Sequence, residues 1–312
     1  MAPSTSSVRN DFVVVKRLTK PEGGDHGACN SGIYLVKLKT TGKKYVEKRL
    51  GLRAIRNGFA QTEKDILKKC AHANIVDYKC SDLDPAGLGY ASIYTQHYEL
   101  GALDTLIDRF HDRGRHPIPE RFLWKVLADM ALALCYLATG VDASQLRFAG
   151  RTAHRRSGWT PIVHQDIKPG NVFLTWKCET SQYPALVLGD VGCAVRRSEY
   201  AGYRAGAPAF YPPEGFAKFA VERDVYQLGL VVHCLAQLLR VPWEEGGLVR
   251  EDPLGGTRYS GELGKVAKAC LRRRGGERPR AGELPAALWE VAEGRRREGR
   301  GVGVELPGWA VG

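Results

Sequence analysis

A polar stretch spanning residues 163–174 carries the side-chain types needed to move a phosphoryl group. It holds Asp166, Lys168 and Asn171 at short spacing before an apolar run, and Asp190 follows downstream between two glycines. A carboxylate on a glycine-flanked turn and an asparagine amide are hard oxygen ligands of the kind that Mg²⁺ prefers. Asp166 can orient and deprotonate a hydroxyl, while Lys168 can offset charge on a phosphoryl group in transit.

A lysine and a glutamate nearer the N-terminus are expected to pair in an apolar layer. Period-2 alternation in the strand predicted over residues 44–50 turns Lys48 into that layer and Glu47 towards water. Glu63 shares the apolar face of the next predicted helix with Phe59. Because buried charges are costly unless paired, Lys48 and Glu63 are predicted to bind each other. The alternative is a lysine whose stem lies along apolar surface and a tolerated glutamate.

The elements that must position these residues change type along the chain. The first third is rich in β-branched and aromatic residues, with one helix predicted near residues 59–70. The predicted strands are Phe12 to Val15, Gly32 to Leu38, Tyr45 to Leu50 and Ala91 to Thr95.

From Gly101 onward, helical spacing dominates, above all in residues 122–134 and in the apolar stretch 225–239. The fold class predicted is therefore α+β with two lobes, a small β-rich N-lobe and a larger, mainly helical C-lobe. Residues 139–160 and the chain from Gly294 are expected to be loop or linker.

Length and composition fit one large domain or two lobes that share a core. The 312 residues are 44% hydrophobic and 26% charged, which excludes a wholly disordered or collagen-like chain. No apolar run reaches the ~18 residues of a membrane span, so no span is expected. The first ten residues lack the apolar stretch of a signal peptide, and the eight cysteines contain no C-x-x-C pair. We therefore expect an intracellular protein, cytoplasmic or nuclear, with buried thiols.

The formal net charge of +12 favours acidic partners or reflects solubility alone. We do not expect nucleic acid as a partner, because no motif that reads RNA or DNA accompanies the charge. The basic insert at residues 147–156 has two readings: a docking surface for an acidic or phosphorylated partner, or a solvated loop.

Seven motifs together resemble the eukaryotic protein kinase superfamily, Ser/Thr type, with a loosely NIMA-like character. In chain order they are Lys48, Glu63, His164-Gln165-Asp166 with Lys168 and Asn171, Asp190-Val191-Gly192, Pro212-Pro213-Glu214, Asp224 and Arg278. The resemblance implies a flexible N-terminus at 1–11, a kinase domain at 12–292 (N-lobe 12–96, C-lobe 97–292) and an Arg/Gly-rich tail at 293–312.

The resemblance also implies the roles of individual residues. Asp166 would be the catalytic base, Lys168 the γ-phosphate contact, and Asn171 and Asp190 the ligands of Mg²⁺. Glu214 would pair with Arg278, and Asp224 would hold the backbone near Asp166. The implied ATP-binding residues are Gly24, Gly27, Ile33, Val46, Lys48, Glu63, Gln96 and Tyr98.

Four departures from the family pattern leave two functions open. The glycine-rich loop is out of register, with Ser31 where its last glycine is expected, and Val191 replaces a phenylalanine. Ala207 replaces a threonine that contacts the catalytic aspartate in the family, a loss expected to loosen substrate positioning. The leading reading is a Ser/Thr kinase that moves the γ-phosphoryl group of Mg-ATP to a protein substrate. The alternative is a pseudokinase, an ATP-binding scaffold with little or no turnover.

The fourth departure concerns regulation. Gln165 replaces the arginine that in the family grips a phosphorylated activation segment, which indicates regulation by other means. The only aliphatic hydroxyl between the metal-binding aspartate and Glu214 is Ser198. Arginines of the same segment, Arg197 among them, can neutralise a phosphate there but cannot tether it to the catalytic residues.

Overall fold

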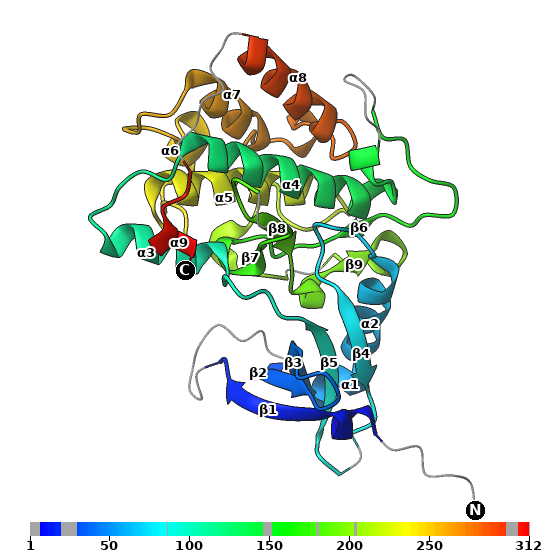
Figure 1. Cartoon of the computed structure of the whole chain (residues 1–312). Helices are drawn as coiled ribbons and strands as arrows, with labels where there is room; N and C mark the ends of the chain where they lie inside the picture. The colour runs from blue at the N-terminus through cyan, green and yellow to red at the C-terminus, as the bar shows by residue number, and fades with distance from the viewer. Residues whose placement is uncertain are drawn as a thin grey trace, which may run out of the picture. The chain divides into compact units, whose positions relative to one another are not determined.

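The computed structural model divides the chain into two units, one rich in strands and one rich in helices (Figure 1). The first comprises Met1–Ala71 and Val76–His97, and the second comprises His72–Ile75 and Tyr98–Gly312. The structure describes residues 7–19, 30–85, 87–145, 152–178, 181–202, 205–297 and 305–311. The predicted α+β class is confirmed, with a β-rich N-terminal part and a mainly helical C-terminal part.

The N-terminal unit is built on a five-stranded antiparallel sheet in the order β1-β2-β3-β5-β4. Its elements are η1 (Val8–Asp11), β1 (Phe12–Arg17), β2 (Asn30–Leu38), β3 (Lys44–Gly51), α1 (Leu52–Arg56), α2 (Phe59–Lys69), β4 (Tyr78–Asp82) and β5 (Tyr90–Gln96). The four predicted strands and the predicted helix are all present. The sequence analysis missed β4, an edge strand whose residues Tyr-Lys-Cys-Ser-Asp show no apolar alternation.

Both faces of this sheet carry buried side chains, so the prediction that Glu47 faces water is wrong. Glu47 is only 3% exposed. Its carboxylate accepts hydrogen bonds from the hydroxyls of Ser92 and Tyr94 at 2.8 and 3.2 Å, and Arg49 donates to it at 2.9 Å. Phe12 packs on this face, with its ring stacked on Tyr94 at 4.3 Å between centroids. Alternation alone could not show that a second layer covers the sheet.

Two long helices form the centre of the C-terminal unit, and both were predicted. Its helices are α3 (Leu103–Asp112), α4 (Glu120–Thr139), α5 (Glu222–Gln237), α6 (Gly246–Glu251), α7 (Gly261–Cys270), α8 (Leu284–Arg297) and α9 (Gly308–Val311). Short 3₁₀ turns are η2 (Ala143–Gln145), η3 (Pro169–Asn171), η4 (Val191–Cys193), η5 (Arg197–Glu199), η6 (Pro208–Phe210) and η7 (Gly275–Glu277). Helices α4 and α5 pack against each other, as Figure 1 shows.

Two small antiparallel strand pairs complete this unit: β6 (Ile162–Val163) with β9 (Val195–Arg196), and β7 (Val172–Thr175) with β8 (Ala185–Leu188). Strands β8 and β9 flank the turn that carries Asp190. The chain between β6 and β7 carries Asp166, Lys168 and Asn171.

Helix α4 is long and apolar enough to cross a membrane by length and composition, with a mean hydropathy of 1.5. However, 72% of its most apolar window is buried inside the protein, as in the core helix of a globular protein. Its buried Asp129 is bound by Lys125 one turn earlier and accepts the backbone N–H of Leu186 in β8 at 2.9 Å. These contacts tie the helix to the β7–β8 pair.

The C-terminal end of the chain is more ordered than the sequence indicated. Helix α8 continues to Arg297, so the loop predicted from Gly294 is wrong for its first four residues. Further on, Trp309 of α9 packs on Phe110 of α3 at 4.8 Å between ring centroids. Arg109 of α3 also donates a hydrogen bond to the carbonyl of Ala310 at 2.8 Å.

The expectation of buried thiols is correct only in part. Cys70, Cys135, Cys234 and Cys270 are buried, and burial raises the pKa of Cys270 to about 12. Cys178 is exposed, which contradicts the expectation at that position. Cys29 lies outside the described residues.

The pair predicted between Glu214 and Arg278 is present and offers a test of the fold. The Arg278 side chain is 0% exposed and donates two hydrogen bonds to the Glu214 carboxylate at 2.7 and 2.6 Å. Because Glu214→Ala leaves a buried guanidinium without its counter-charge, we expect it to lower the free energy of unfolding by about 3 kcal/mol. Urea denaturation measures this loss.

The matched control is Glu283→Ala, which removes an exposed partner of Arg280 at 3.7 Å. Exposed pairs contribute little, so this variant should lose less than about 1 kcal/mol. Equal losses in the two variants would contradict a stabilising role for the buried pair.

Candidate functional site

Helix α5 holds the loop between β6 and β7, residues 164–171, through hydrogen bonds; we call this loop the Asp166 loop. Asp224, 2% exposed, accepts the backbone N–H groups of His164 and Gln165 at 2.7 and 3.0 Å. Burial raises the pKa of Asp224, and the two amides act in the opposite direction. The contact that the resemblance implied for Asp224 is therefore present.

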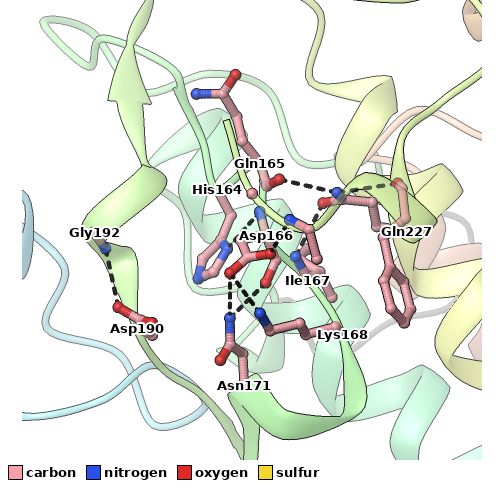
Figure 2. Close-up of polar contacts among 12 residues, drawn as sticks. His164, Gln165, Asp166, Ile167, Lys168, Asn171, Asp190, Gly192 and Gln227 are labelled. Carbon is pink, nitrogen blue, oxygen red and sulfur yellow. Dashed lines mark hydrogen bonds and ion pairs between the residues drawn. The ribbon is translucent and has the colours of Figure 1, made fainter. Parts of the chain in front are cut away.

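Gln227, one helical turn after Asp224, holds the same loop and was missed by the sequence analysis. Its Oε1 accepts the N–H of Ile167 at 3.0 Å, and its Nε2 donates to the carbonyl of Gln165 at 3.0 Å (Figure 2). A signal existed: Gln227 is a polar residue near the start of a mostly apolar stretch, three positions after Asp224 and hence on the same helix face.

Three groups converge on the carboxylate of Asp166, which is 6% exposed. Lys168 Nζ lies 3.2 Å from Oδ2, and Asn171 Nδ2 donates to the same oxygen at 2.9 Å. The backbone N–H of Ala207 donates to Oδ1 at 2.8 Å. Figure 2 shows the Lys168 and Asn171 side chains directed at Asp166. Donors on both oxygens hold the carboxylate in one orientation.

The contact from Ala207 to Asp166 comes from the backbone. The loss of the threonine hydroxyl is expected to loosen substrate positioning, and that expectation stays a prediction. The backbone amide of Ala207 nevertheless donates to Asp166, because Gly206 adopts a left-handed conformation with φ of +85°. A Cβ at Gly206 would lie 2.3 Å from the carbonyl oxygen of Gln165, so only glycine fits there.

Asn171 and Asp190 are brought alongside each other by backbone contacts. The Gly189 N–H donates to the carbonyl of Asn171 at 2.8 Å, and the His164 ring contacts the Gly189 carbonyl at 2.9 Å. A Cβ at Gly189 would lie 2.3 Å from the Phe173 ring, so any other residue here requires that ring to shift. In Figure 2, Asp190 stands to one side of Asn171, separate from the Asp166 group.

The donor set fits Mg²⁺. Asn171 directs both hydrogen bonds of its Nδ2 at Asp166, which leaves its Oδ1 as a ligand oxygen. Asp190 is exposed, and its carboxylate contacts the Gly192 N–H at 3.4 Å. Within the described residues, no group of three or more His, Cys, Asp or Glu side chains could hold a metal ion alone. This is expected for Mg²⁺, which proteins bind through one or two side chains together with substrate phosphates.

Gln165 ties the Asp166 loop to the segment after Asp190 without using charge. Its backbone has a φ of +69°, and its side-chain Nε2 donates to the carbonyl of Cys193 at 2.8 Å. Val191, which stands where the family has a phenylalanine, is 1% exposed, so this smaller side chain is still fully covered by its neighbours. Gln165, at the position where the family has an arginine, therefore makes an uncharged hydrogen bond to the segment that follows Asp190.

In the N-terminal unit, the predicted ion pair is present. Lys48 Nζ of β3 lies 2.8 Å from Glu63 Oε1 of α2, and the two side chains are 15% and 7% exposed. Phe59, however, is 40% exposed, so its predicted place on the buried face of α2 is wrong. Phe59 is the first residue of α2, and the rest of the predicted face is buried as expected, with Ala60 buried beside it.

Ile33 and Val46 share the sheet face of Lys48. Ile33 of β2 lies directly opposite Lys48, and Val46 stands two residues earlier on β3. All three are partly exposed, which leaves an apolar surface beside the ammonium group within this unit.

The remaining predicted ATP-binding residues lie in different units or outside the described residues. Gln96 ends β5 and donates from its side chain to the carbonyl of His97 at 3.0 Å. Tyr98 belongs to the C-terminal unit, where its ring lies parallel to Phe173 at 5.9 Å. Gly24 and Gly27 lie outside the described residues.

Comparisons with known proteins agree on one class of relative. The chain is 27% identical over 294 residues to the human serine/threonine-protein kinase Nek2, covering 88% of this chain and 60% of the relative. It is 28% identical over 239 residues to the G2-specific protein kinase nim-1 of Neurospora crassa, covering 70% and 26%. No protein-family model matches the chain. The chain thus spans about 60% or less of the length of these relatives.

A third relative, the probable serine/threonine-protein kinase nek2 of Dictyostelium discoideum, is 28% identical over 236 residues, covering 71% of this chain and 50% of the relative. The roles of the individual residues remain predictions.

The Gly206 backbone generates a test of the site's geometry. Gly206→Ala strains a left-handed residue and drives a methyl group into the Gln165 carbonyl. We expect it to lower the free energy of unfolding by roughly 1–3 kcal/mol more than Gly215→Ala does. Gly215 is a matched control, because its φ is +72° but no atom lies within 4 Å of its added Cβ. Equal losses, measured by thermal unfolding, would show that the Gly206–Ala207 backbone is not held against the Asp166 loop.

Proposed function

We propose that this chain, which is similar in sequence to NIMA-like eukaryotic Ser/Thr protein kinases, transfers the γ-phosphoryl group of Mg-ATP to protein hydroxyls. The observation that supports this most strongly is the Asp166 carboxylate, which is contacted by Lys168 and Asn171 in a loop anchored to α5. In this proposal, residues 12–292 form the kinase domain and the protein acts inside the cell.

The Asp166 loop would carry out the transfer. Asp166 accepts the proton of the substrate hydroxyl as the hydroxyl oxygen bonds to the γ-phosphorus, while the bond from that phosphorus to the bridging oxygen breaks and ADP leaves. Lys168, 3.2 Å from that carboxylate, offsets negative charge on the phosphoryl group during transfer. Asn171 and Asp190 would hold Mg²⁺, which when bound neutralises charge on the phosphates.

The N-terminal unit would supply nucleotide contacts. Glu63 orients the ammonium group of Lys48, which in the family contacts the α- and β-phosphates. Ile33 and Val46 offer apolar surface for the adenine ring. We also assign nucleotide contacts to Gln96 and Tyr98, and phosphate contacts to the glycine-rich loop with Gly24 and Gly27.

The alternative function is an ATP-binding scaffold with little or no turnover. It takes support from the three donors on Asp166, which leave little of its carboxylate open to a substrate hydroxyl. Binding of Mg-ATP without transfer would favour the scaffold, whereas transfer favours the kinase.

Asp166→Asn tests the transfer step. The amide cannot accept the hydroxyl proton, so we expect a loss of about 10²–10⁴-fold in the rate of ³²P transfer from labelled Mg-ATP to a serine-containing protein. Asp252→Asn, an exposed carboxylate on the same unit, should keep the parent rate. Transfer that is equally fast in Asp166→Asn would contradict the assigned base.

Lys48→Met tests the nucleotide site independently of turnover. Ligand at 100 times its Kd stabilises a folded protein by roughly 2.7 kcal/mol, which raises Tm by several degrees at about 2–4 °C per kcal/mol. We expect millimolar Mg-ATP to give this rise in the parent and a much smaller one in Lys48→Met.

Lys44→Met is the matched control, since Lys44 is an exposed lysine on the same strand. It should retain the full shift. If the parent shows no shift at all, both the kinase and the ATP-binding scaffold fail.

A further inference from the structure

The amide that Ala207 donates to Asp166 is aimed by a contact on the other side of the same peptide bond. The N–H of Ala207 and the carbonyl of Gly206 belong to one planar peptide unit, so a contact that fixes the carbonyl also fixes the direction of the N–H. The Tyr211 hydroxyl donates to that carbonyl at 3.1 Å. The Ala207 nitrogen lies 2.8 Å from Asp166 Oδ1. Tyr211 therefore acts on the orientation of Asp166 through the backbone.

Tyr211 packs in turn against a second ring, and we call Tyr200, Tyr211 and Phe216 the aromatic cluster. The rings of Tyr211 and Phe216 meet edge to face, with 4.8 Å between their centroids. The Tyr200 hydroxyl donates to the backbone carbonyl of Phe216 at 2.5 Å. Phe216 is 7% exposed. Because ring pairs prefer particular geometries, a shift of the buried Phe216 would displace Tyr211 as well.

Arg223, near the start of α5, holds the aromatic cluster from the side of the helix. It is 2% exposed, and its guanidinium group donates to the Tyr200 hydroxyl at 2.5 Å and also to the carbonyl of Lys218. The guanidinium carbon lies 5.2 Å from the centre of the Tyr200 ring and 4.9 Å from that of Phe216. A planar group with several fixed donors can bind a hydroxyl and a carbonyl while it also lies over aromatic rings, and a lysine lacks that geometry.

Helix α5 thus reaches Asp166 from two directions. Its Asp224 and Gln227 bind the Asp166 loop, whereas Arg223 binds the aromatic cluster that aims the amide of Ala207. We propose that Arg223 is a positioning residue for phosphoryl transfer, which orients the Asp166 carboxylate through the aromatic cluster and that amide. The role in transfer rests on the proposed function, but the orientation of the carboxylate does not.

Tyr211→Phe is the mildest test, because it removes the hydroxyl and keeps the ring that packs on Phe216. We expect kcat for a serine peptide to fall about 10–100-fold, since a slightly misplaced catalytic group costs this much. The KM for Mg-ATP and the rise in Tm that Mg-ATP causes should stay at the parent values, because the cluster is separate from the assigned nucleotide contacts. Arg223→Lys keeps the positive charge but lacks the planar fork, so it should show the same pattern.

Tyr259→Phe is the matched control for the loss of a tyrosine hydroxyl. Tyr259 is half-buried like Tyr211, and its hydroxyl donates to the carbonyl of Ile118 at 2.8 Å, in the same unit but outside the aromatic cluster. This variant should keep the parent kcat. A fall in kcat equal to that of Tyr211→Phe would show that loss of stability alone slows the protein, and it would overturn the proposal.

The double variant Arg223→Lys/Tyr211→Phe tests whether the two residues act through the same contacts. If they do, its kcat should be close to that of the slower single variant, because the second change removes nothing further. Losses that multiply in the double variant would show two independent effects and would contradict positioning through the aromatic cluster.

Hydrogen exchange of the Ala207 amide, followed by NMR, gives a readout that needs no activity. We expect this amide to exchange about fivefold or more faster in Tyr211→Phe and in Arg223→Lys than in the parent, and at the parent rate in Tyr259→Phe. Unchanged exchange in the first two variants would overturn the proposed orientation. Absence of transfer in the parent would instead overturn the proposed function, and with it the role of Arg223 in transfer.

Discussion

The geometry of the candidate site depends on two buried polar side chains of helix α5. Asp224 and Gln227 bind the backbone of the Asp166 loop at His164, Gln165 and Ile167. A carboxylate buried this deeply is stable only if donors replace the water that it has lost, and the two backbone amides do so. Helix α5 and the Asp166 loop therefore satisfy each other's buried hydrogen-bonding groups. Asp166 is held in place by these contacts, which involve no ligand and no modification.

The same constraint explains other polar groups in both units. Glu63 neutralises the charge of Lys48, and Glu214 neutralises that of Arg278. Asp129 is bound by Lys125 and by a backbone N–H of β8. In each case a charge that would be costly alone fixes the relative position of two elements within one unit. The candidate site is one instance of a general arrangement in which buried charges define contacts between elements.

Periodicity predicted what depends on local spacing: strands β1, β2, β3 and β5 of the sheet, helices α2, α4 and α5, and the Lys48–Glu63 pair. It failed where distant segments decide the environment. Glu47 is buried because β1 and η1 cover its face, and Phe59 is exposed at the first residue of α2. The contact between Asp166 and the amide of Ala207 could not be predicted from side-chain identity, because the donor is backbone and its position depends on the left-handed Gly206.

The contact made by Gln165 distinguishes this site from one that is ordered only after phosphorylation. Its neutral side chain holds the carbonyl of Cys193, so the Asp166 loop and the following segment are joined before any phosphate is added. The most direct measurement uses chain from which a phosphatase has removed all phosphate, after the phosphatase itself has been taken away. Mg-ATP and a serine peptide are then added, and peptide phosphorylation is followed over the first minutes. A site that is preformed without phosphate predicts peptide phosphorylation at a constant rate with no lag. A lag that disappears when the chain is first incubated with Mg-ATP would contradict a preformed site.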